Sequence, residues 1–326
     1  SITIGRLAAD SITLAPEVLG QPVEGRLTAA LGLSGGEGSA NLLLERLDDG
    51  PSGRIALTAS YSNASQTLAI DLGATEGANG LVVNALGIPG RPEAELTVKG
   101  KGPFTGFIAD LALSTNGAPR LAGRVVTQSV TGQTGFAANL AGDLAPLFLP
   151  DYAAFFGPSV SLIAQGTAHD DGRLDLTRAH LTGQALDLTG ALSLAADGSP
   201  RSFDLQGRIA QPDGTAVLLP LTSDLPVRIQ SADIALGYDR EDGDGWTTRA
   251  SLTGLDRDDL RLSSLVLSGS GRIIPGQFDA NFRFDAEGLQ PTDAALSRAL
   301  GSVLSGDAVV SYATDTPGAA GTRDPT

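Results

Sequence analysis

Apolar and polar residues alternate strictly in many short runs along this chain. In the stretch 278–286, for example, polar residues separate Phe278, Ala280, Phe282, Phe284 and Ala286. Because the side chains of a β-strand point alternately to its two faces, this period of two predicts strands with one apolar and one polar face. Similar runs recur roughly every 10–20 residues, which predicts about 17 strands joined as a repeated antiparallel meander.

Turn dipeptides lie between these runs. A Gly that follows Asp or Asn adopts a positive φ at little cost, so such pairs are typical of tight hairpin turns. The chain contains six pairs at these places: Asp49-Gly50, Asn116-Gly117, Asp171-Gly172, Asp197-Gly198, Asp213-Gly214 and Asp242-Gly243.

Helical patterns are scarce. We expect three short helices, at residues 293–300 with Thr292 as the N-cap, at 79–86, and at 151–156. About 17 strands spaced about 4.8 Å apart make a sheet on the order of 80 Å long. Helices this short cannot cover most of its apolar face. The sheet must therefore curl on itself, pack on another sheet, or leave a lined groove.

The predicted fold class is thus all-β. We expect a long antiparallel meander curled into a taco-like or solenoid-like groove with a hydrophobic interior, plus about three short helices. Residues 1–312 form one repeated strand segment with a possible helical insert at 144–157. Residues 313–326, rich in Gly and Pro, are expected to form a disordered tail.

Composition excludes several classes of function. The chain of 326 residues has no Cys, two His and a net charge of 22 − 37 = −15. Without Cys there are no disulfides, no thiolate-bound zinc and no iron–sulfur clusters. Nucleic-acid partners require clustered Lys and Arg, so the acidic balance argues against them. We expect no cofactor and no metal.

Three stretches resemble one known family. Thr75 to Val126 contains LGIPG, GKGPF, DLAL and RLAGRV in that order. Gly135 to Gly157 reads as a strand followed by a short aromatic helix, and the run from Ala195 reads as two further strands with a connector. In this order they closely resemble the N-terminal half of the TamB family, the inner-membrane components of the translocation and assembly module and relatives of AsmA-like proteins. The resemblance covers roughly residues 20 to 310, and the sequence after Tyr312 departs from it.

The resemblance implies a location and a function. It implies the periplasm of a Gram-negative bacterium, in a protein held in the inner membrane by an N-terminal anchor outside this segment. It further implies a non-enzymatic hydrophobic groove that carries phospholipid between the inner and outer membranes and supports outer-membrane protein and autotransporter assembly. The implied partners are phospholipid acyl chains and a BamA/TamA-like outer-membrane protein, bound through a region outside this segment.

The apolar faces of the strands are the candidate lining of such a groove. We expect lining residues at Leu57, Ile70, Leu111, Leu113, Leu186, Leu188, Leu192, Leu194, Phe203, Leu205, Ile209, Ile234, Leu236, Phe278, Phe282 and Phe284. The alternative is a secreted or surface β-solenoid with a structural or adhesive role, in which the same residues form a filled core.

Two other motifs are typical of catalysis but have simpler interpretations. Gly32 to Gly36 reads Gly-Leu-Ser-Gly-Gly and matches a hydrolase nucleophile elbow, which needs a strand that turns into a helix; we interpret it as a hairpin loop. His169 and His180 lie near Asp170 and Asp171 and could form a metal or acid–base site; we interpret them as surface or strand-end residues. An enzyme is therefore not expected.

Three further clusters also favour structural interpretations. The acidic stretch 239–245 could bind calcium but lacks the spacing of a calcium loop, so we expect a solvated turn after Tyr238. The glycines at 100, 102 and 106 fall short of a dinucleotide motif and indicate a kinked strand. The aromatic residues Phe148, Tyr152, Phe155 and Phe156 could gate a groove, but a short helix packed against one end of the sheet explains them.

Overall fold

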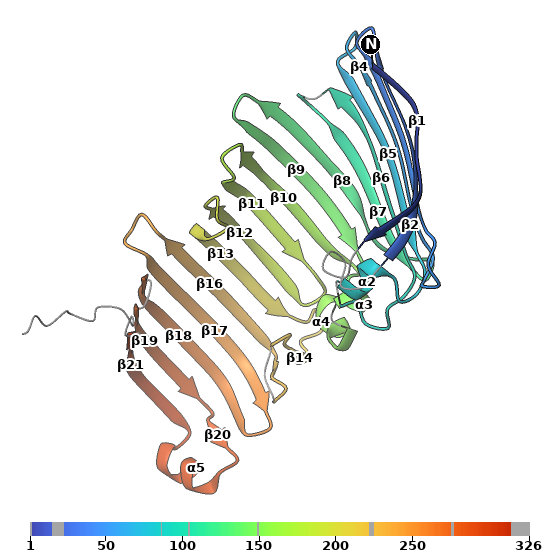
Figure 1. Cartoon of the computed structure of the whole chain (residues 1–326). Helices are drawn as coiled ribbons and strands as arrows, with labels where there is room; N and C mark the ends of the chain where they lie inside the picture. The colour runs from blue at the N-terminus through green and yellow to red at the C-terminus, as the bar shows by residue number, and fades with distance from the viewer. Residues whose placement is uncertain are drawn as a thin grey trace, which may run out of the picture.

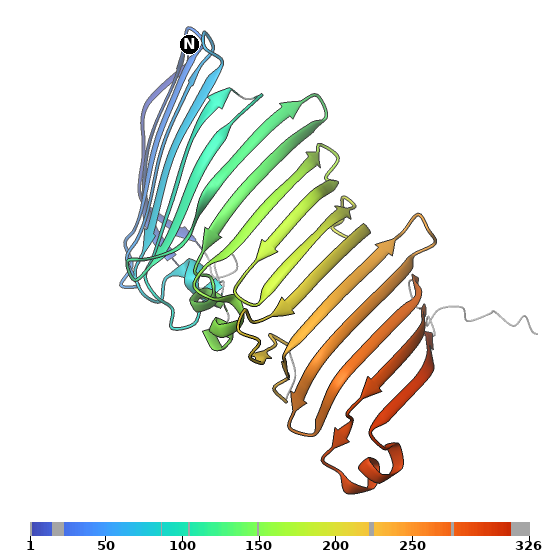
Figure 2. The same cartoon turned by 180° about the vertical axis from the view of Figure 1, so that it is seen from behind.

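One continuous antiparallel sheet makes up nearly all of the molecule (Figures 1 and 2). The computed structural model describes residues 2–14, 23–85, 87–103, 105–148, 150–221, 225–274 and 277–313. Of the disordered tail expected at 313–326, residue 313 instead ends strand β21 (Val303–Ala313), and residues 314–326 lie outside the described residues. The sheet is not closed into a barrel, which confirms the predicted all-β, curled meander.

The strands follow one another along the sheet in sequence order. Within the described ranges, eighteen strands have eight or more residues, close to the predicted 17, and three others have two residues. Their bounds are β1 Ile2–Leu14, β2 Val23–Ser34, β3 Glu37–Arg46, β4 Gly53–Ser62, β5 Thr67–Glu76, β6 Ala94–Pro103, β7 Ile108–Thr115, β8 Ala118–Val130, β9 Gln133–Gly142, β10 Val160–His169, β11 Leu174–Thr182, β12 Leu186–Leu194, β13 Pro200–Ala210, β14 Val217–Leu218, β15 Arg228–Ile229, β16 Ser231–Asp239, β17 Gly245–Arg257, β18 Leu260–Ile274, β19 Gln277–Glu287, β20 Gln290–Pro291 and β21 Val303–Ala313.

The pairing order departs from a simple meander at two places. β13 pairs with β16, so the chain between them leaves the sheet and forms the short β14–β15 pair. β19 pairs with β21, and the segment between them carries β20 and a helix. All other long strands pair with their neighbours in sequence.

The helices in the described residues are short and few. They are α2 Leu81–Ala85, α3 Ala145–Phe148, the 3-10 turn η1 Pro150–Tyr152, α4 Ala153–Phe156 and α5 Ala294–Leu300. The three predicted helical segments are therefore present. The predicted N-cap of the last one was wrong by one residue: the Asp293 side chain accepts from the N–H groups of Ala295 and Leu296, whereas the Thr292 hydroxyl donates to Asp259.

All the helices lie at the same end of the strands (Figure 1). Tight turns join β2 to β3, β4 to β5, β8 to β9, β10 to β11, β12 to β13 and β16 to β17, and we call this edge the turn rim. The longer connections that carry α2, α3, α4, β14, β15 and α5 lie at the opposite edge, which we call the helix rim. The two edges of the sheet therefore differ in structure.

Several predicted turns adopt the expected backbone. Asn116 and Gly117 have φ of 49° and 70°, and the glycines of the later Asp-Gly pairs also have positive φ. Asp49-Gly50 differs: Gly50 lies in a longer connection where its N–H donates to the Asp48 carboxylate at 2.8 Å, so no positive φ is needed. Asp213-Gly214 turns within the connection from β13 to β14 rather than in a hairpin.

Two clusters of buried residues anchor the helix rim. In the first, Phe155 of α4 packs with Ala185, Val217, Ile229 and Ala232. In the second, the buried side chains are Val83, Ile88 and Leu147, which belong to the connections around α2 and α3. The helices therefore pack against one end of the strands, as expected for the aromatic segment; the side chain of Phe148 lies outside the described residues.

An exposed apolar face as the candidate functional site

The register of the strands gathers the apolar residues on one face of the sheet. Residues directly opposite each other in an antiparallel pair point to the same face. One such row crosses seven strands and contains Leu188, Gly207, Ile234, Ala250, Leu267, Phe284 and Gly306. The adjacent row on the other face contains Thr189, Gln206, Ala235, Arg249, Ser268, Arg283 and Asp307. We call these the apolar face and the polar face.

All sixteen residues expected to line a groove take register positions on the apolar face. The side chain of Phe278 lies outside the described residues, although its backbone pairs with Ile273 and Tyr312. The remaining fifteen come from β4, β5, β7, β12, β13, β16 and β19. Residues that are far apart in the sequence therefore lie on one face of the sheet.

This face is not covered by the protein in the part of the chain that the structure describes. None of the fifteen side chains is buried, and Leu236 is 39% exposed. At the helix rim, by contrast, Ile229 is 0% and Leu147 1% exposed. A filled core would bury the residues of the central rows as it buries these two. The central rows instead form an open, half-exposed apolar surface.

Glycines opposite large side chains shape this surface. Phe282 of β19 lies opposite Gly269 of β18, and Phe136 of β9 lies opposite Gly166 of β10. A Cβ on Gly269 would come within 2.6 Å of the Phe282 ring. Large rings therefore lie across the neighbouring backbone where no Cβ is present. The sequence alone does not reveal this arrangement, because only the register shows which residues lie opposite each other.

Aromatic side chains gather on the apolar face between β13 and β19. Phe203 and Tyr238 stack with ring centroids 5.5 Å apart, and Trp246 and Phe282 are 5.6 Å apart. Tyr238 and Trp246 lie opposite each other in register. The Tyr238 hydroxyl donates to Asp244 at 2.9 Å, and burial together with this carboxylate raises the pKa of Tyr238.

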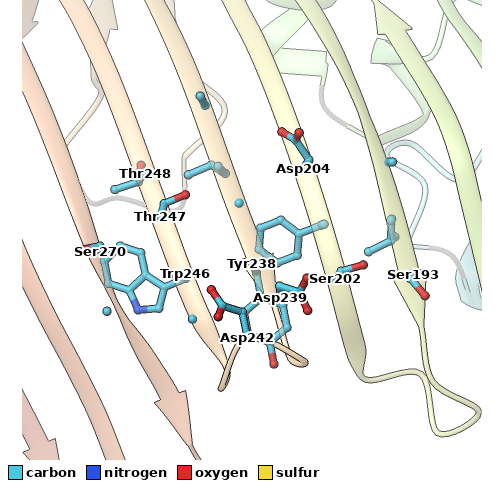
Figure 3. Close-up of a pocket in the computed structure, with 18 of the residues that line it drawn as sticks. Ser193, Ser202, Asp204, Tyr238, Asp239, Asp242, Trp246, Thr247, Thr248 and Ser270 are labelled. Carbon is cyan, nitrogen blue, oxygen red and sulfur yellow. The ribbon is translucent and has the colours of Figure 1, made fainter.

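The hollows of the described sheet lie over both faces. One of about 1230 Å³ is lined mostly from polar-face positions of β11 to β19, among them Ser193, Ser202, Asp204 and Asp239 (Figure 3). A hollow of about 350 Å³ lies over β2 to β5 and is lined mostly from the apolar face, by Leu31, Leu33, Gly38, Ala40, Ala59, Tyr61 and Leu68, and also by Gly32, Ser39 and Ser60.

The two histidines lie on the polar face and bind different carboxylates. His169 contacts Asp175 at 2.7 Å, and His180 contacts Asp187 at 3.0 Å. The Ser193 hydroxyl also donates to Asp175, at 2.6 Å, rather than to a histidine. This serine and then His169 hold the pKa of Asp175 below its usual range. Both the serine and the imidazole bind the carboxylate, so the imidazole is not placed to take the serine's proton.

The remaining motifs have structural roles. Ser34 ends β2, and Gly35 and Gly36 form the turn to β3 with positive φ, so the hydrolase-like motif lies in an antiparallel hairpin. The stretch 240–244 forms the turn between β16 and β17. No group of three or more His, Cys, Asp or Glu side chains arranged to hold a metal occurs in the described ranges.

None of the helices in the described part of the chain is long and apolar enough to cross a lipid bilayer. A scan against protein-family models found no match, and searches of curated proteins and of solved structures found no similar protein. The candidate site therefore has to be interpreted from its own chemistry.

Proposed function

We propose that this chain is a non-enzymatic segment of a TamB-like periplasmic protein of a Gram-negative bacterium, in which the apolar face carries phospholipid acyl chains between the inner and outer membranes. The observation that supports this most strongly is the open apolar face, continuous over consecutive strands and half-exposed at its central rows. Soluble proteins rarely leave an apolar surface of this extent without a partner.

The chemistry of the face suits an acyl chain better than a peptide. Its central rows consist of Leu, Ile, Ala, Phe and Gly, which offer contact area but few side-chain hydrogen-bonding groups. Arg46 and Glu76 also occupy apolar-face positions, and both lie at the helix rim. An acyl chain needs no hydrogen-bond partner, whereas a buried peptide backbone does.

The energetics suit passage rather than storage. Each CH₂ group that leaves water for an apolar surface contributes about 0.8 kcal/mol. An acyl chain that moves from a bilayer to this face exchanges one apolar environment for another, so the net change in its transfer free energy is close to zero. A uniform face along the sheet lets a lipid enter and leave without a deep trap. The role in outer-membrane protein assembly and the anchor and partner outside this segment are part of the same proposal.

Lipid extraction tests this proposal. The purified chain is analysed by native mass spectrometry and by extraction of bound lipid, with a soluble sheet protein of similar size as the control. We expect phospholipid on this chain and none on the control. A chain that purifies from a lipid-rich lysate without phospholipid would contradict the proposal and favour a structural or adhesive role.

A further inference from the structure

Between β12 and β19, the two rims of the apolar face differ in polarity. At the turn rim, Tyr61 and Tyr238 have their rings on the apolar face, and their hydroxyl groups donate to the turn residues Asn63 and Asp244 at 3.5 and 2.9 Å. Trp246 lies beside Tyr238 at the same rim (Figure 3). The two tyrosine rings thus have an apolar body on the face and a hydrogen-bonded hydroxyl group at the edge, whereas the Trp246 ring lies beside Tyr238 with its Nε1 buried near Gly271.

The turn rim carries a further polar feature on the same face. Ser129 and Thr134, which end β8 and begin β9, occupy apolar-face positions, and their hydroxyl groups are hydrogen-bonded at 3.0 Å. Farther from this rim the same two strands carry Val125 and Ala138 opposite each other. On β8 and β9, polarity on the apolar face therefore increases toward the turn.

Buried apolar clusters close the helix rim near α2 to α4 and near β14 and β15, whereas the part of this rim at β3 and β5 carries Arg46 and Glu76. The buried clusters around Phe155 and Leu147 occupy this edge, and Leu186, Ile209 and Leu252 pack against the first of them. One of the four tyrosines, Tyr152, also lies here and packs against the Phe155 cluster. No room remains for a hydrated group where Ile229 is 0% and Leu147 1% exposed.

Tyr and Trp rings favour the boundary between hydrocarbon and water, because one end of each ring is apolar and the other forms hydrogen bonds. Resting on the proposed function, we propose that a two-chain phospholipid binds the apolar face with its head group at the turn rim beside Tyr238 and Trp246, and with its acyl chains pointing toward the helix rim. The lipid thus lies along the strands while it moves across them.

The dimensions agree with this orientation. Trp246 and Leu252 lie on the same face of β17, six residues apart, which corresponds to about 20 Å at about 3.4 Å per residue. Half of a bilayer's hydrocarbon core is about 15 Å thick. One acyl chain therefore extends over most of the distance from the aromatic positions to the residues that pack against the Phe155 cluster.

Trp246, the single tryptophan of the chain, allows a direct test. Its fluorescence is measured with vesicles of phosphatidylcholine brominated either near the glycerol or near the methyl end of the acyl chain. Bromine quenches at contact, and the positions of Trp246 and Leu252 are about 20 Å apart, so we expect the lipid brominated near the glycerol to quench Trp246 about twofold or more strongly than the other lipid does. In the variant Trp246→Phe with Leu252→Trp, the order should reverse.

The outcomes separate the orientation from the proposed function. Trp246→Phe with Thr247→Trp moves the probe to the polar face, where neither lipid should quench. Equal or reversed quenching of Trp246 would overturn the orientation and leave lipid binding in place. Quenching by neither lipid would overturn the proposed function itself. The comparison of the two lipids on the native chain requires no substitution, so it stands even if the Leu252→Trp variant does not fold.

Discussion

Phe282 on β19 lies directly opposite Gly269 on β18, with its ring where a Cβ of residue 269 would stand. Such a Cβ would come within 2.6 Å of the ring and 3.0 Å of Thr248. Gly269→Val should therefore displace the ring and destabilise the fold by about 1–3 kcal/mol, as overpacking usually does. Urea unfolding followed by circular dichroism measures the change.

Gly73 provides the matched control. It lies on the polar face of β5 with nothing within 4 Å of its Cβ position and no unusual φ, so Gly73→Val should change stability by less than about 0.5 kcal/mol. Equal effects at the two glycines would show that the contact with Phe282 does not constrain the sheet.

A charge on the apolar face should remove lipid without unfolding the protein. Leu188 is half-buried, so Leu188→Asp should cost less than about 2 kcal/mol while reducing the phospholipid that co-purifies. Ile229, fully buried at the helix rim, should behave differently: Ile229→Asp should cost more than about 4 kcal/mol and unfold that region. Circular dichroism melts and lipid extraction give the two readouts.

Thr189→Asp, one residue along and on the polar face, is the control for Leu188→Asp and should change neither readout. If Leu188→Asp unfolds the chain as severely as Ile229→Asp does, the apolar face is a sealed core, and the conduit is contradicted.

Gln211 ties α4 to the end of the sheet. Its amide donates to the Ala154 carbonyl at 2.6 Å and its oxygen accepts from Gln184 at 3.1 Å. Gln211→Leu leaves both partners unsatisfied near a buried cluster, so we expect a loss of about 1–3 kcal/mol. Gln206 is exposed, so Gln206→Leu should change the free energy of unfolding by less than about 0.5 kcal/mol. Thermal melts of the two variants should differ accordingly; equal melting temperatures would refute this role of Gln211.

The stability of the chain should fall in acid partly through Asp175. Ser193 and then His169 lower the pKa of Asp175 in the folded state, whereas the unfolded value is near 4. Ionised Asp175 therefore favours folding above about pH 4, and this contribution is lost as the pH falls through the folded pKa. Ser193→Ala should destabilise the chain at pH 7, and its difference from the native chain should shrink on acidification.

Urea midpoints of the native chain and of Ser193→Ala, measured at pH 7 and near pH 3, test this coupling. A difference that stays constant over that range would show that the Ser193 hydroxyl does not act through the charge of Asp175.

Sequence periodicity was sufficient for the fold class, because a period of two assigns each side chain to a face once a strand forms. It also placed all sixteen candidate lining residues on one face. It could not show that the long connections all lie at one rim, since this depends on the pairing of β13 with β16 and of β19 with β21. Nor could it show the contacts of Phe282 with Gly269 or of Tyr238 with Asp244, which depend on register and turn geometry.

The sequence also could not decide which residue caps the last helix, Thr292 or Asp293. Thr292 and Asp293 are both good caps, and only the backbone decides which oxygen faces the first N–H groups. Solvent exposure is the property of the candidate site that the sequence predicts least well. The alternating pattern of Leu188 and Leu205 suits a filled core or an open face equally well, and only the three-dimensional arrangement distinguishes them.

Photocrosslinking from paired positions tests the central claim most directly. A photoreactive amino acid is placed at Leu188 or Phe282 on the apolar face and at Thr189 or Arg283 on the polar face, and the illuminated protein is analysed for covalently attached phospholipid. The account predicts lipid adducts from the first pair and none from the second. Equal labelling from both faces, or no labelling from Leu188 and Phe282, would contradict it.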